Sequence, residues 1–343
     1  MKKRFKKFMA GILAACTIFG QASVVYAQET VDMTETQNMV KSYLTGEEIN
    51  EAAGRRRPIA VMMGNNMQGA PQSGISKAGV IYEAPVEGNM TRLMAIIGDY
   101  DSLEKIGSVR SCRDYYLFYA NEFDSIYVHF GQAVYALQYL DAHMIDNLNG
   151  LYLDGSVFYR TSDRKAPHNA YTSFSNLQNG IANYGYRQIY KDDYNGHYKF
   201  AQDNTEITLE EGSIANNVYL NCYGDNHPWF AYDAEAKEYR RFQYGEAHID
   251  KETGEQLTCD NIILQYSSYQ PYDANGYLNI DTVSGGNGKY ITRGKAIDIT
   301  WQKDSQWGIT RYYDANGQEI QLNPGKTWVE IVLNDKVDSV VYE

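Results

Sequence analysis

Apolar and polar positions in the first half of the chain repeat with two different periods. Short apolar runs bounded by turn residues predict strands, at residues 59–63, 80–84, 91–98 and 126–130. Apolar side chains at helical spacing predict helices, at residues 112–122, 134–148 and from Thr172 or Ser173 to Tyr184-Gly185. Ser111 and Asp114 have the spacing of a capping box for the first of these helices, and Asn149-Gly150 should end the second.

Beyond about residue 215 the pattern changes to short β-branched and aromatic runs. Asp-Ala-Asn-Gly, Gly-Gly-Asn-Gly and Asn-Pro-Gly turns separate these runs, and this spacing is typical of antiparallel strands. The expected fold class is therefore α+β. An N-terminal mixed α/β domain at residues 55–200 should precede a β-rich antiparallel C-terminal domain at residues 215–343.

The first 27 residues have the pattern of an export signal, with a basic start, an apolar middle and a small-residue end. Cleavage after Val25-Tyr26-Ala27 would release a soluble protein, whereas Leu13-Ala14-Ala15-Cys16 would allow a lipid anchor on Cys16. The run after Cys16 stays apolar, which favours the soluble form, and no later segment is apolar enough to span a membrane. Residues 28–54 are polar and acidic, so we expect a tether with one short helix there.

Charge and cysteine content limit the partners of this chain. Removal of residues 1–27 leaves 26 Lys and Arg against 43 Asp and Glu, a net charge of −17. Such a chain does not bind nucleic acid or an anionic membrane through its overall field, so any anion site must be local. Cys222 and Cys259 could pair, since export permits disulfides. The three cysteines that remain are too scattered for a metal cluster.

Basic side chains concentrate in two segments of this acidic chain. Arg110 and Arg113 flank Ser111 at the expected start of a helix, where free N–H groups and a partial positive charge favour a carboxylate or phosphate. His129 ends the next expected strand and could donate a proton. The following loop adds further basic residues, Arg160, Arg164, Lys165 and His168. The sequence therefore predicts a local anion site.

These residues also have structural interpretations. Arg110 and Arg113 could pair with nearby carboxylates, and a histidine on an apolar strand is typical of a satisfied core residue. Cys112 lies where a helix start and two arginines would lower the pKa of a thiol, although packing of the first helical turn is the simpler interpretation.

The strands at residues 80–84 and 91–98 should form a hairpin around Glu87-Gly88. With a two-residue loop, Glu83 lies opposite Arg92, a cross-strand pair of about 0.2–1 kcal/mol. Glu83 and Glu87 could alternatively serve as an acid and base pair. For Glu87 we favour a turn role.

Two further signals concern ligands. Asp273-Ala274-Asn275-Gly276 and Asp314-Ala315-Asn316-Gly317 lack the additional acidic ligands of a calcium loop, so we expect turns, no metal and no cofactor. Tyrosine makes up 31 of 343 residues, and its ring suits both sheet packing and stacking on sugars.

Several sequence segments, taken in their order along the chain, match one protein family. They are RPIAVMMGNN, APQSGISKAGVIYEAPVEGNMTRLMAI, KIGSVRSCRDYY, SIYVHFG and RKAPHNAYTS, followed by NIILQ, GNGKYITRGKAIDITWQK, RYYDANGQEI and NPGKTW. In order and spacing, over about residues 55–340, the chain resembles the YerB-like lipoprotein family of Gram-positive bacteria. The resemblance implies a two-domain envelope protein without an assigned activity.

The resemblance extends to single positions. The residues that match the family pattern are Arg92, Arg110, Arg113, His129, Lys165, Pro167 and His168. Cys112 replaces the family's usual Ala or Ser, which argues against a thiol nucleophile. Phe130-Gly131-Gln132 replaces a Gly-Gly-Ser-like turn, which puts a backbone oxyanion role in doubt.

Two functional hypotheses follow. The first is an exported or surface protein that binds an anionic wall component, either a peptidoglycan carboxylate or a wall-polymer phosphate. Its anion-binding residues would be Arg92, Arg110, Ser111, Arg113, Arg164 and Lys165. The alternative is a hydrolase or transferase acting on an anionic wall glycopolymer, with His129, His168 and Glu83 as catalytic candidates. Because the sequence reveals no nucleophile–base pair, binding is favoured.

Overall fold

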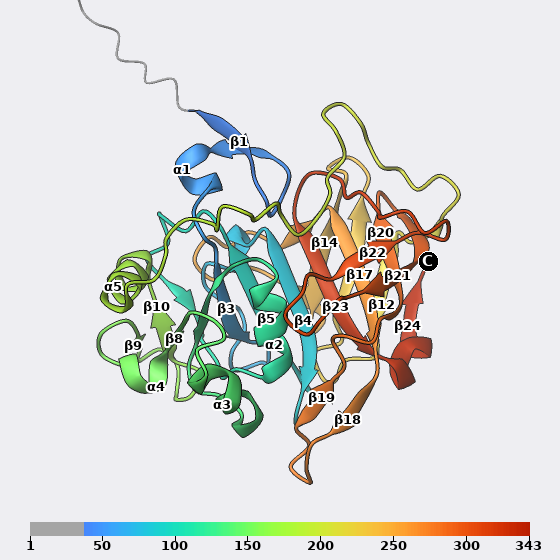
Figure 1. Cartoon of the computed structure of the whole chain (residues 1–343). Coiled ribbons are helices and arrows are strands. Elements are labelled where there is room, and N and C mark those ends of the chain that lie inside the picture. Colours follow the sequence, from blue (N-terminus) through green and yellow to red (C-terminus); the bar gives the residue numbers. More distant parts are fainter. Residues whose placement is uncertain (1–37) are drawn as a thin grey trace, which may run out of the picture. The chain divides into compact units, whose positions relative to one another are not determined.

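One mixed sheet joins the two halves of the chain in the computed structural model, which describes residues 38–343 (Figure 1). Its strand order is β11-β21-β20-β17-β23-β4-β5-β3-β7-β8, with β22 paired to β21. The strands from the N-terminal half are β3 (Ile59–Gly64), β4 (Val80–Val86), β5 (Met90–Ile97), β7 (Ile126–His129) and β8 (Asn147–Asn149). Those from the C-terminal half are β11 (Ser213–Ile214), β17 (Asn261–Ser267), β20 (Gly286–Thr292), β21 (Lys295–Gln302), β22 (Arg311–Tyr313) and β23 (Thr327–Leu333).

The directions of these strands define one functional edge. β4 pairs in parallel with β23, and β23 pairs in parallel with β17. β3, β7 and β8 are parallel to one another, while β5 runs antiparallel to both β3 and β4. Six strands therefore end on the same side, which we call the carboxyl edge. Ligands of open sheets bind outside such an edge.

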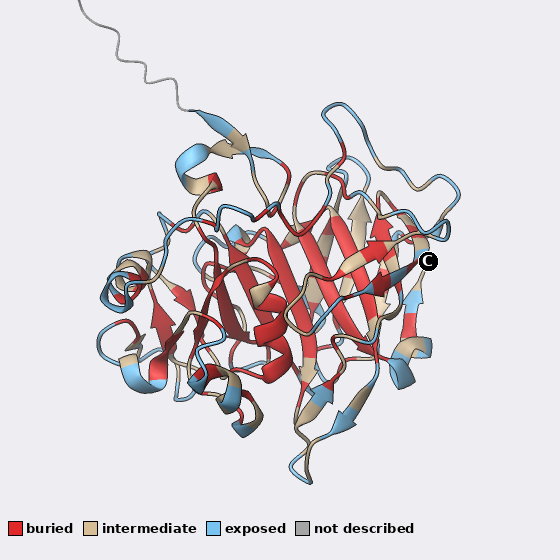
Figure 2. Ribbon diagram, viewed as in Figure 1, coloured by how far each residue is buried: buried red, intermediate tan, exposed pale blue. Residues whose placement is uncertain are grey.

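Both faces of the sheet are buried, as the central strands of Figure 2 show. In β3, Ile59, Val61 and Met63 pack into one core cluster, whereas Ala60 and Met62 pack into the other. This alternation follows from the two-residue period of a strand. A continuous apolar run is expected for a strand that is covered on both faces.

Helices and a second sheet supply the covers. α2 (Asp114–Asn121) and α3 (Val134–Asp141) pack on one face. α5 (Phe174–Tyr184) packs on the other, together with a sheet of order β15-β14-β13-β12-β24 to which β16 is added. The strands of this second sheet are β12 (Asn217–Leu220), β13 (Trp229–Asp233), β14 (Glu238–Gln243), β15 (Glu246–Ala247), β16 (Thr258–Cys259) and β24 (Val340–Tyr342).

Short elements complete the described chain. They are β1 (Met39–Lys41), β2 (Glu48–Asn50), α1 (Glu51–Gly54), η1 (Ile75–Lys77), β6 (Ile106–Gly107), α4 (Gly150–Leu153), β9 (Tyr159–Arg160), β10 (Ala170–Thr172), β18 (Tyr269–Pro271), β19 (Leu278–Ile280) and η2 (Asn334–Ser339). Residues 38–54 of the expected tether are therefore folded, and Leu44 within them is only 4% exposed. The predicted export signal, its cleavage site and Cys16 lie outside the described residues.

The predicted fold class is confirmed, with a mixed sheet and helices in the N-terminal domain and largely antiparallel strands in the C-terminal domain. Ser173 caps α5 by accepting a hydrogen bond from the backbone N–H of Asn176, and Gly185 ends this helix in the left-handed conformation. The strand at 126–130 is also present as β7. In these elements the local signal agrees with the tertiary packing.

Three local predictions are wrong. The helix predicted over 134–148 ends at Asp141, and residues 147–149 instead form β8, because Leu148 packs in the sheet core. The predicted capping box at Ser111 is not formed, since α2 begins at Asp114 and Arg113 occupies its N-cap position. The predicted Gly-Gly-Asn-Gly turn lies largely within β20, where a Cβ on Gly288 would meet the carbonyl oxygen of Leu264 at 2.3 Å.

Candidate anion site

The segment from Ser108 to Arg113 crosses the carboxyl edge between β3 and β7. The Arg110 N–H donates to the Met62 carbonyl at 2.9 Å, and the Arg110 carbonyl accepts from the Phe130 N–H at 3.0 Å. Further along, the Cys112 N–H donates to the Gly131 carbonyl at 2.9 Å. These backbone hydrogen bonds hold the segment at the carboxyl edge of the sheet, which is where α/β proteins bind ligands.

Three guanidinium groups gather at this segment, and two of them pair with the carboxylate of Glu87. Arg113 makes a two-point ion pair with Glu87, in which Nε lies 2.9 Å from Oε2. Arg92 donates to the Ser111 carbonyl, and its Nη2 lies 3.9 Å from Glu87 Oε1. Arg110 is half-buried and donates from Nη1 to the Pro167 carbonyl at 2.9 Å.

The positive charge of this group is only partly neutralised. Within residues 38–343, Arg110 has no carboxylate within ion-pair distance, and Glu87 is the one carboxylate paired with Arg92 and Arg113. Burial, then the charge of Arg113, lowers the pKa of Arg92 to about 10. The same two causes lower the pKa of Arg110. The arginines therefore repel one another in a partly desolvated setting that an anion would relieve.

The loop at residues 160–168 supplies the other predicted residues. Arg164 donates to the carbonyl oxygens of Gly69, Ala70 and Pro71, so its guanidinium organises the neighbouring loop. Lys165 is exposed and forms no ion pair with any described carboxylate. Arg160 instead pairs with Asp154 at 2.9 Å and lies over the Phe130 ring.

His168 lies near two of these cations, Arg110 and Arg164. Burial, followed by the charges of Arg110 and Arg164, lowers the pKa of His168, so the ring is neutral at physiological pH. Its Nδ1 atom is buried and has no hydrogen-bond partner among the described residues. The ring thus offers a neutral polar group beside Arg110.

Tyrosines from both domains flank the cations. The Arg113 guanidinium carbon lies 5.2 Å from the ring centroid of Tyr277, in the loop between β18 and β19. Tyr272 from the same loop stacks on Tyr135 with a centroid distance of 3.9 Å, and its hydroxyl donates to Asp114 at 2.5 Å. The C-terminal domain therefore lies directly against the start of α2.

Glu83 is not part of this group of cations, and the predicted Glu83–Arg92 pairing is wrong. The hairpin loop holds three residues, Glu87-Gly88-Asn89, so that Arg92 lies opposite Ala84 and Glu83 lies opposite Leu93. The left-handed conformations of Gly88 and Asn89 make this longer loop possible. The one-residue change of register turns Glu83 to the other face of the sheet.

On that face Glu83 lies in a closed polar network. It accepts hydrogen bonds from Asn65, Thr91 and Asn226, and it pairs with the fully buried Arg241 of β14. Sequence reasoning missed Arg241 and Asn226, because both lie more than 140 positions away along the chain. No local motif marks either residue.

His129 and Cys112 are core residues in this structure. The two ring nitrogens of His129 lie 2.8 Å from the Gly131 carbonyl oxygen and 3.2 Å from Asn147 Oδ1, and burial lowers the pKa of His129. The expectation of a depressed thiol pKa is wrong, because burial raises the pKa of Cys112 to about 12. Cys222 and Cys259 are free thiols and do not pair.

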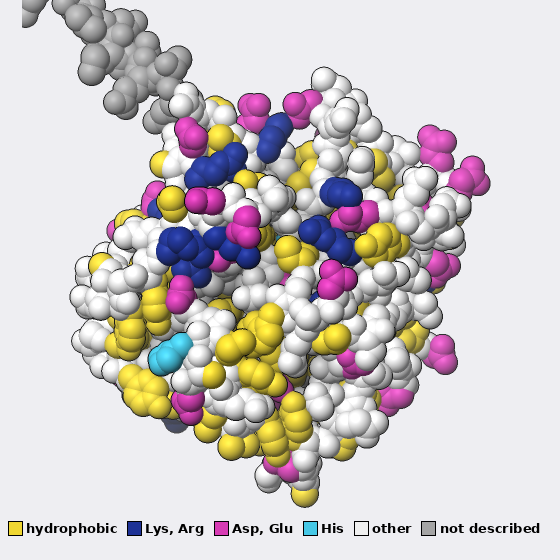
Figure 3. Space-filling model, viewed as in Figure 1, with side chains coloured by type: hydrophobic (Ala, Val, Ile, Leu, Met, Phe, Trp, Pro, Cys, Tyr) yellow, Lys and Arg dark blue, Asp and Glu magenta, His cyan; other side chains and the backbone are white. Residues whose placement is uncertain are grey.

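The structure thus brings the arginines together but not the catalytic candidates. Across the described chain, no hydrogen bond links His129, His168 and Glu83 to one another. No group of three His, Cys, Asp or Glu side chains in that range could hold a metal ion. On the face drawn in Figure 3, Lys and Arg side chains gather mostly in the upper half, near β1 and α1, and not at the lower end, where β18 and β19 lie.

Fold and site together define a class of two-domain protein in which one mixed sheet serves both domains and basic side chains gather at its carboxyl edge. Residues 44–187 match the N-terminal domain, and residues 218–329 the C-terminal domain, of a protein family of unknown function, DUF3048. The chain belongs to this family.

Two relatives extend the match. The chain is 34% identical over 335 residues to "Putative lipoprotein YerB" of Bacillus subtilis (strain 168), covering 95% of this chain and 96% of that protein. The crystal structure of the YerB protein from Bacillus subtilis is similar with a TM-score of 0.78 at 33% identity, covering 89% of this chain and 99% of that chain. The resemblance to the YerB-like family is confirmed. None of the helices described between residues 38 and 343 has the length and hydropathy needed to cross a bilayer.

Proposed function

We propose that this protein is exported to the cell envelope and binds an anionic wall component through Arg92, Arg110 and Arg113. The ligand group is a carboxylate of peptidoglycan or a phosphate of a wall polymer. The observation that carries this proposal is the local charge balance: among the described residues, Arg92 and Arg113 share the single carboxylate of Glu87, and Arg110 beside them has no ion-pair partner. Arg110 is left free to make charge-assisted hydrogen bonds to a ligand.

The surroundings of Arg110 support a polymeric ligand. Lys165 is exposed on the loop whose Pro167 carbonyl accepts from Arg110, and it can contact a second anionic group. Ser111 and the neutral His168 add hydrogen-bonding capacity. Tyr135, Tyr272 and Tyr277 provide ring faces near Arg113, and such faces suit the apolar side of a sugar. Together these groups fit a charged glycopolymer.

Export is supported by the pattern of residues 1–27 and by the description of the relative from Bacillus subtilis as a lipoprotein. Mass spectrometry of the mature N-terminus distinguishes lipid on Cys16 from a free end at Gln28. Enzymatic activity on the same polymer has weaker support. His129 and Glu83 are fully buried with their polar atoms engaged, and His168 has no carboxylate partner among the described residues.

The test measures binding of two purified probes, a muropeptide that carries only carboxylates and a teichoic acid fragment that carries phosphates. We expect the mature protein to bind at least one probe, more weakly at high salt. Arg110→Gln should weaken this binding about tenfold or more. Arg240→Gln is the matched control, because Arg240 is a half-buried arginine of β14 that lies outside the site and pairs with Asp233.

Equal affinities for wild type and Arg110→Gln, or an equal loss in Arg240→Gln, would contradict the proposal. The same incubations, analysed for cleaved products, address the alternative function. Products formed by wild type but not by His168→Ala would favour a hydrolase or transferase. Intact probes in both samples would leave binding as the function.

A further inference from the structure

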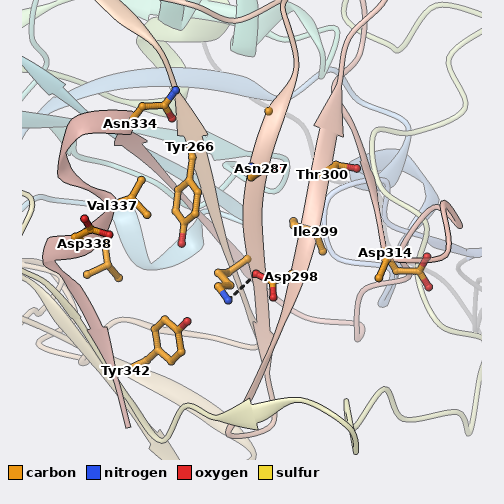
Figure 4. Close-up of a pocket in the computed structure, with 14 residues that line it drawn as sticks. Tyr266, Asn287, Asp298, Ile299, Thr300, Asp314, Asn334, Val337, Asp338 and Tyr342 are labelled. Atoms are coloured by element: carbon orange, nitrogen blue, oxygen red, sulfur yellow. Dashed lines mark ion pairs between the residues drawn. The ribbon is translucent and has the colours of Figure 1, made fainter.

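A groove lies on the C-terminal domain (Figure 4). It has a volume of about 930 Å³ and is lined by residues of β17, β20, β21, η2 and β24. This volume lies near the upper end of the roughly 300–1,000 Å³ found for small-molecule sites. Tyr266 lies near the end of β17, and Asn334 directly follows β23, so this groove also lies at the carboxyl edge.

The floor of the groove is a polar ladder. On the antiparallel pair β20 and β21, Asn287 lies opposite Thr300 and Lys289 lies opposite Asp298. Because side chains alternate between faces, these four residues point to the outer face, whereas the intervening Tyr290, Ile299 and Trp301 are buried in the core. The ladder is therefore held by a rigid and well-packed sheet.

Two tyrosines border this floor. Tyr266 enters from β17 and Tyr342 from β24, and both are half-buried, so part of each ring stays accessible (Figure 4). Lys289 Nζ lies 5.3 Å from the ring centroid of Tyr342 and 2.6 Å from Asp298 Oδ1. The one lysine of the lining is thus already neutralised.

The polar groups of the groove are open to a ligand but do not favour an anion. The lining holds three aspartates, Asp298, Asp314 and Asp338, against Lys289 alone. The side chains of Asn287 and Thr300 make no hydrogen bond to any other described residue. Amide, hydroxyl and carboxylate groups placed beside tyrosine rings can bind vicinal hydroxyls while a ring covers the apolar face of a sugar.

We propose that this groove binds a neutral oligosaccharide. Its acidic lining differs in charge from the arginine site, so the two sites take chemically different parts of a ligand or different ligands. This proposal does not depend on the anion-binding function. The carboxyl edge of one sheet then carries two binding sites, one basic at β3, β4 and β7 and one acidic at β17 and β23.

The experiment titrates the mature protein with neutral trisaccharides, namely triacetylchitotriose, cellotriose and maltotriose, by calorimetry. We expect saturable binding of at least one of them at concentrations up to about 10 mM. Tyr266→Ala should weaken this binding about tenfold, since a stacked ring is lost. Asn287→Ala and Thr300→Val remove exposed polar groups and serve as second variants where Tyr266→Ala lowers folding stability.

Two controls make the result specific to the groove. Tyr152→Ala removes a tyrosine that is 74% exposed on the N-terminal domain, and it should leave the affinity unchanged. Arg240→Gln, which changes an arginine of β14 outside both sites, should do the same. Absence of binding by all three sugars, or unchanged affinity in Tyr266→Ala, Asn287→Ala and Thr300→Val together, would overturn the proposal.

Discussion

Glu122, the residue that follows α2, is a fully buried carboxylate with four polar contacts. It pairs with Lys303 at 2.7 Å and with His197 at 2.6 Å, and it accepts hydrogen bonds from the backbone N–H and hydroxyl of Thr310. Glu122→Gln leaves Lys303 buried without its charge partner. We expect a loss of about 3–5 kcal/mol in the free energy of unfolding. Urea unfolding at neutral pH measures the loss, and the exposed Glu235→Gln is the control.

The same residue gives the protein an acid-sensitive stability. Burial alone would raise the pKa of Glu122, but the charge of Lys303 and the hydrogen bond with His197 lower it to about 2. A lowered folded-state pKa contributes stability above the ordinary value of 4.5, and this contribution is lost as the pH falls from 4.5 toward about 2. Glu122→Gln should therefore flatten the decline of stability in this range. Parallel curves for both proteins would contradict this assignment.

Glu330 should act with the opposite sign. It lies directly opposite Glu83 on the parallel strands β4 and β23, and burial, then the charge of Glu83, raises the pKa of Glu330 well above its ordinary value. The folded protein therefore favours the protonated form, so Glu330 costs stability as the pH rises above its ordinary pKa of 4.5 toward the folded-state pKa. Glu330→Gln should raise stability at pH 7. The check compares the urea midpoints of Glu330→Gln and wild type at pH 5 and at pH 7. A difference between the two proteins that is the same at both pH values would contradict the expectation.

At the scale of single elements, the start of α5 depends on one side chain. Ser173 Oγ accepts the Asn176 N–H at 3.3 Å, which satisfies one of the free donors of the first turn. Ser173→Ala should cost about 1 kcal/mol, measured by urea unfolding. Asn179→Ala, at an exposed position inside the same helix, is the control, and an equal effect of both variants would show that the cap contributes nothing specific.

Helices and strands could be predicted from the sequence where residues a few positions apart determine them. The cap at Ser173, the apolar strand β7 and the antiparallel C-terminal strands follow from residues a few positions apart. The helix over 134–148 could not be bounded in this way, because Leu148 has helical spacing in the sequence but packs beside β7 in the sheet. Periodicity shows that a residue is buried, and tertiary contacts decide in which element.

The residues of the candidate site also fall into two groups, those that local sequence predicts and those that tertiary contacts decide. Arg110 and Arg113 are close in sequence, so their clustering could be predicted from the pattern alone. The role of Glu83 could not, because one extra loop residue changes its register and its partner Arg241 comes from the other domain. For Glu87 the sequence favours only a turn role. In the three-residue loop Glu87 instead pairs with Arg113 and is the counter-charge of the site.

For the whole molecule, the sheet makes the two family domains dependent on each other. β4 of the N-terminal domain and β23 of the C-terminal domain are adjacent inside the sheet. Two fully buried ion pairs also connect the domains, Glu83 with Arg241 and Glu122 with Lys303. Separation would expose apolar strand faces and leave buried charges unpaired. We therefore expect the described chain to unfold as one cooperative unit.

The distribution of chromophores allows a direct measurement of this cooperativity. All four tryptophans, Trp229, Trp301, Trp307 and Trp328, lie in the C-terminal domain. Every α-helix of the described chain lies between residues 51 and 184, so helical circular dichroism reports on the N-terminal domain. The urea midpoints of the two signals should coincide, and Glu83→Gln should lower both by the same amount, because its partner Arg241 belongs to the other domain. Two separate midpoints, or a change in one signal only, would show that each domain is stable without the shared sheet.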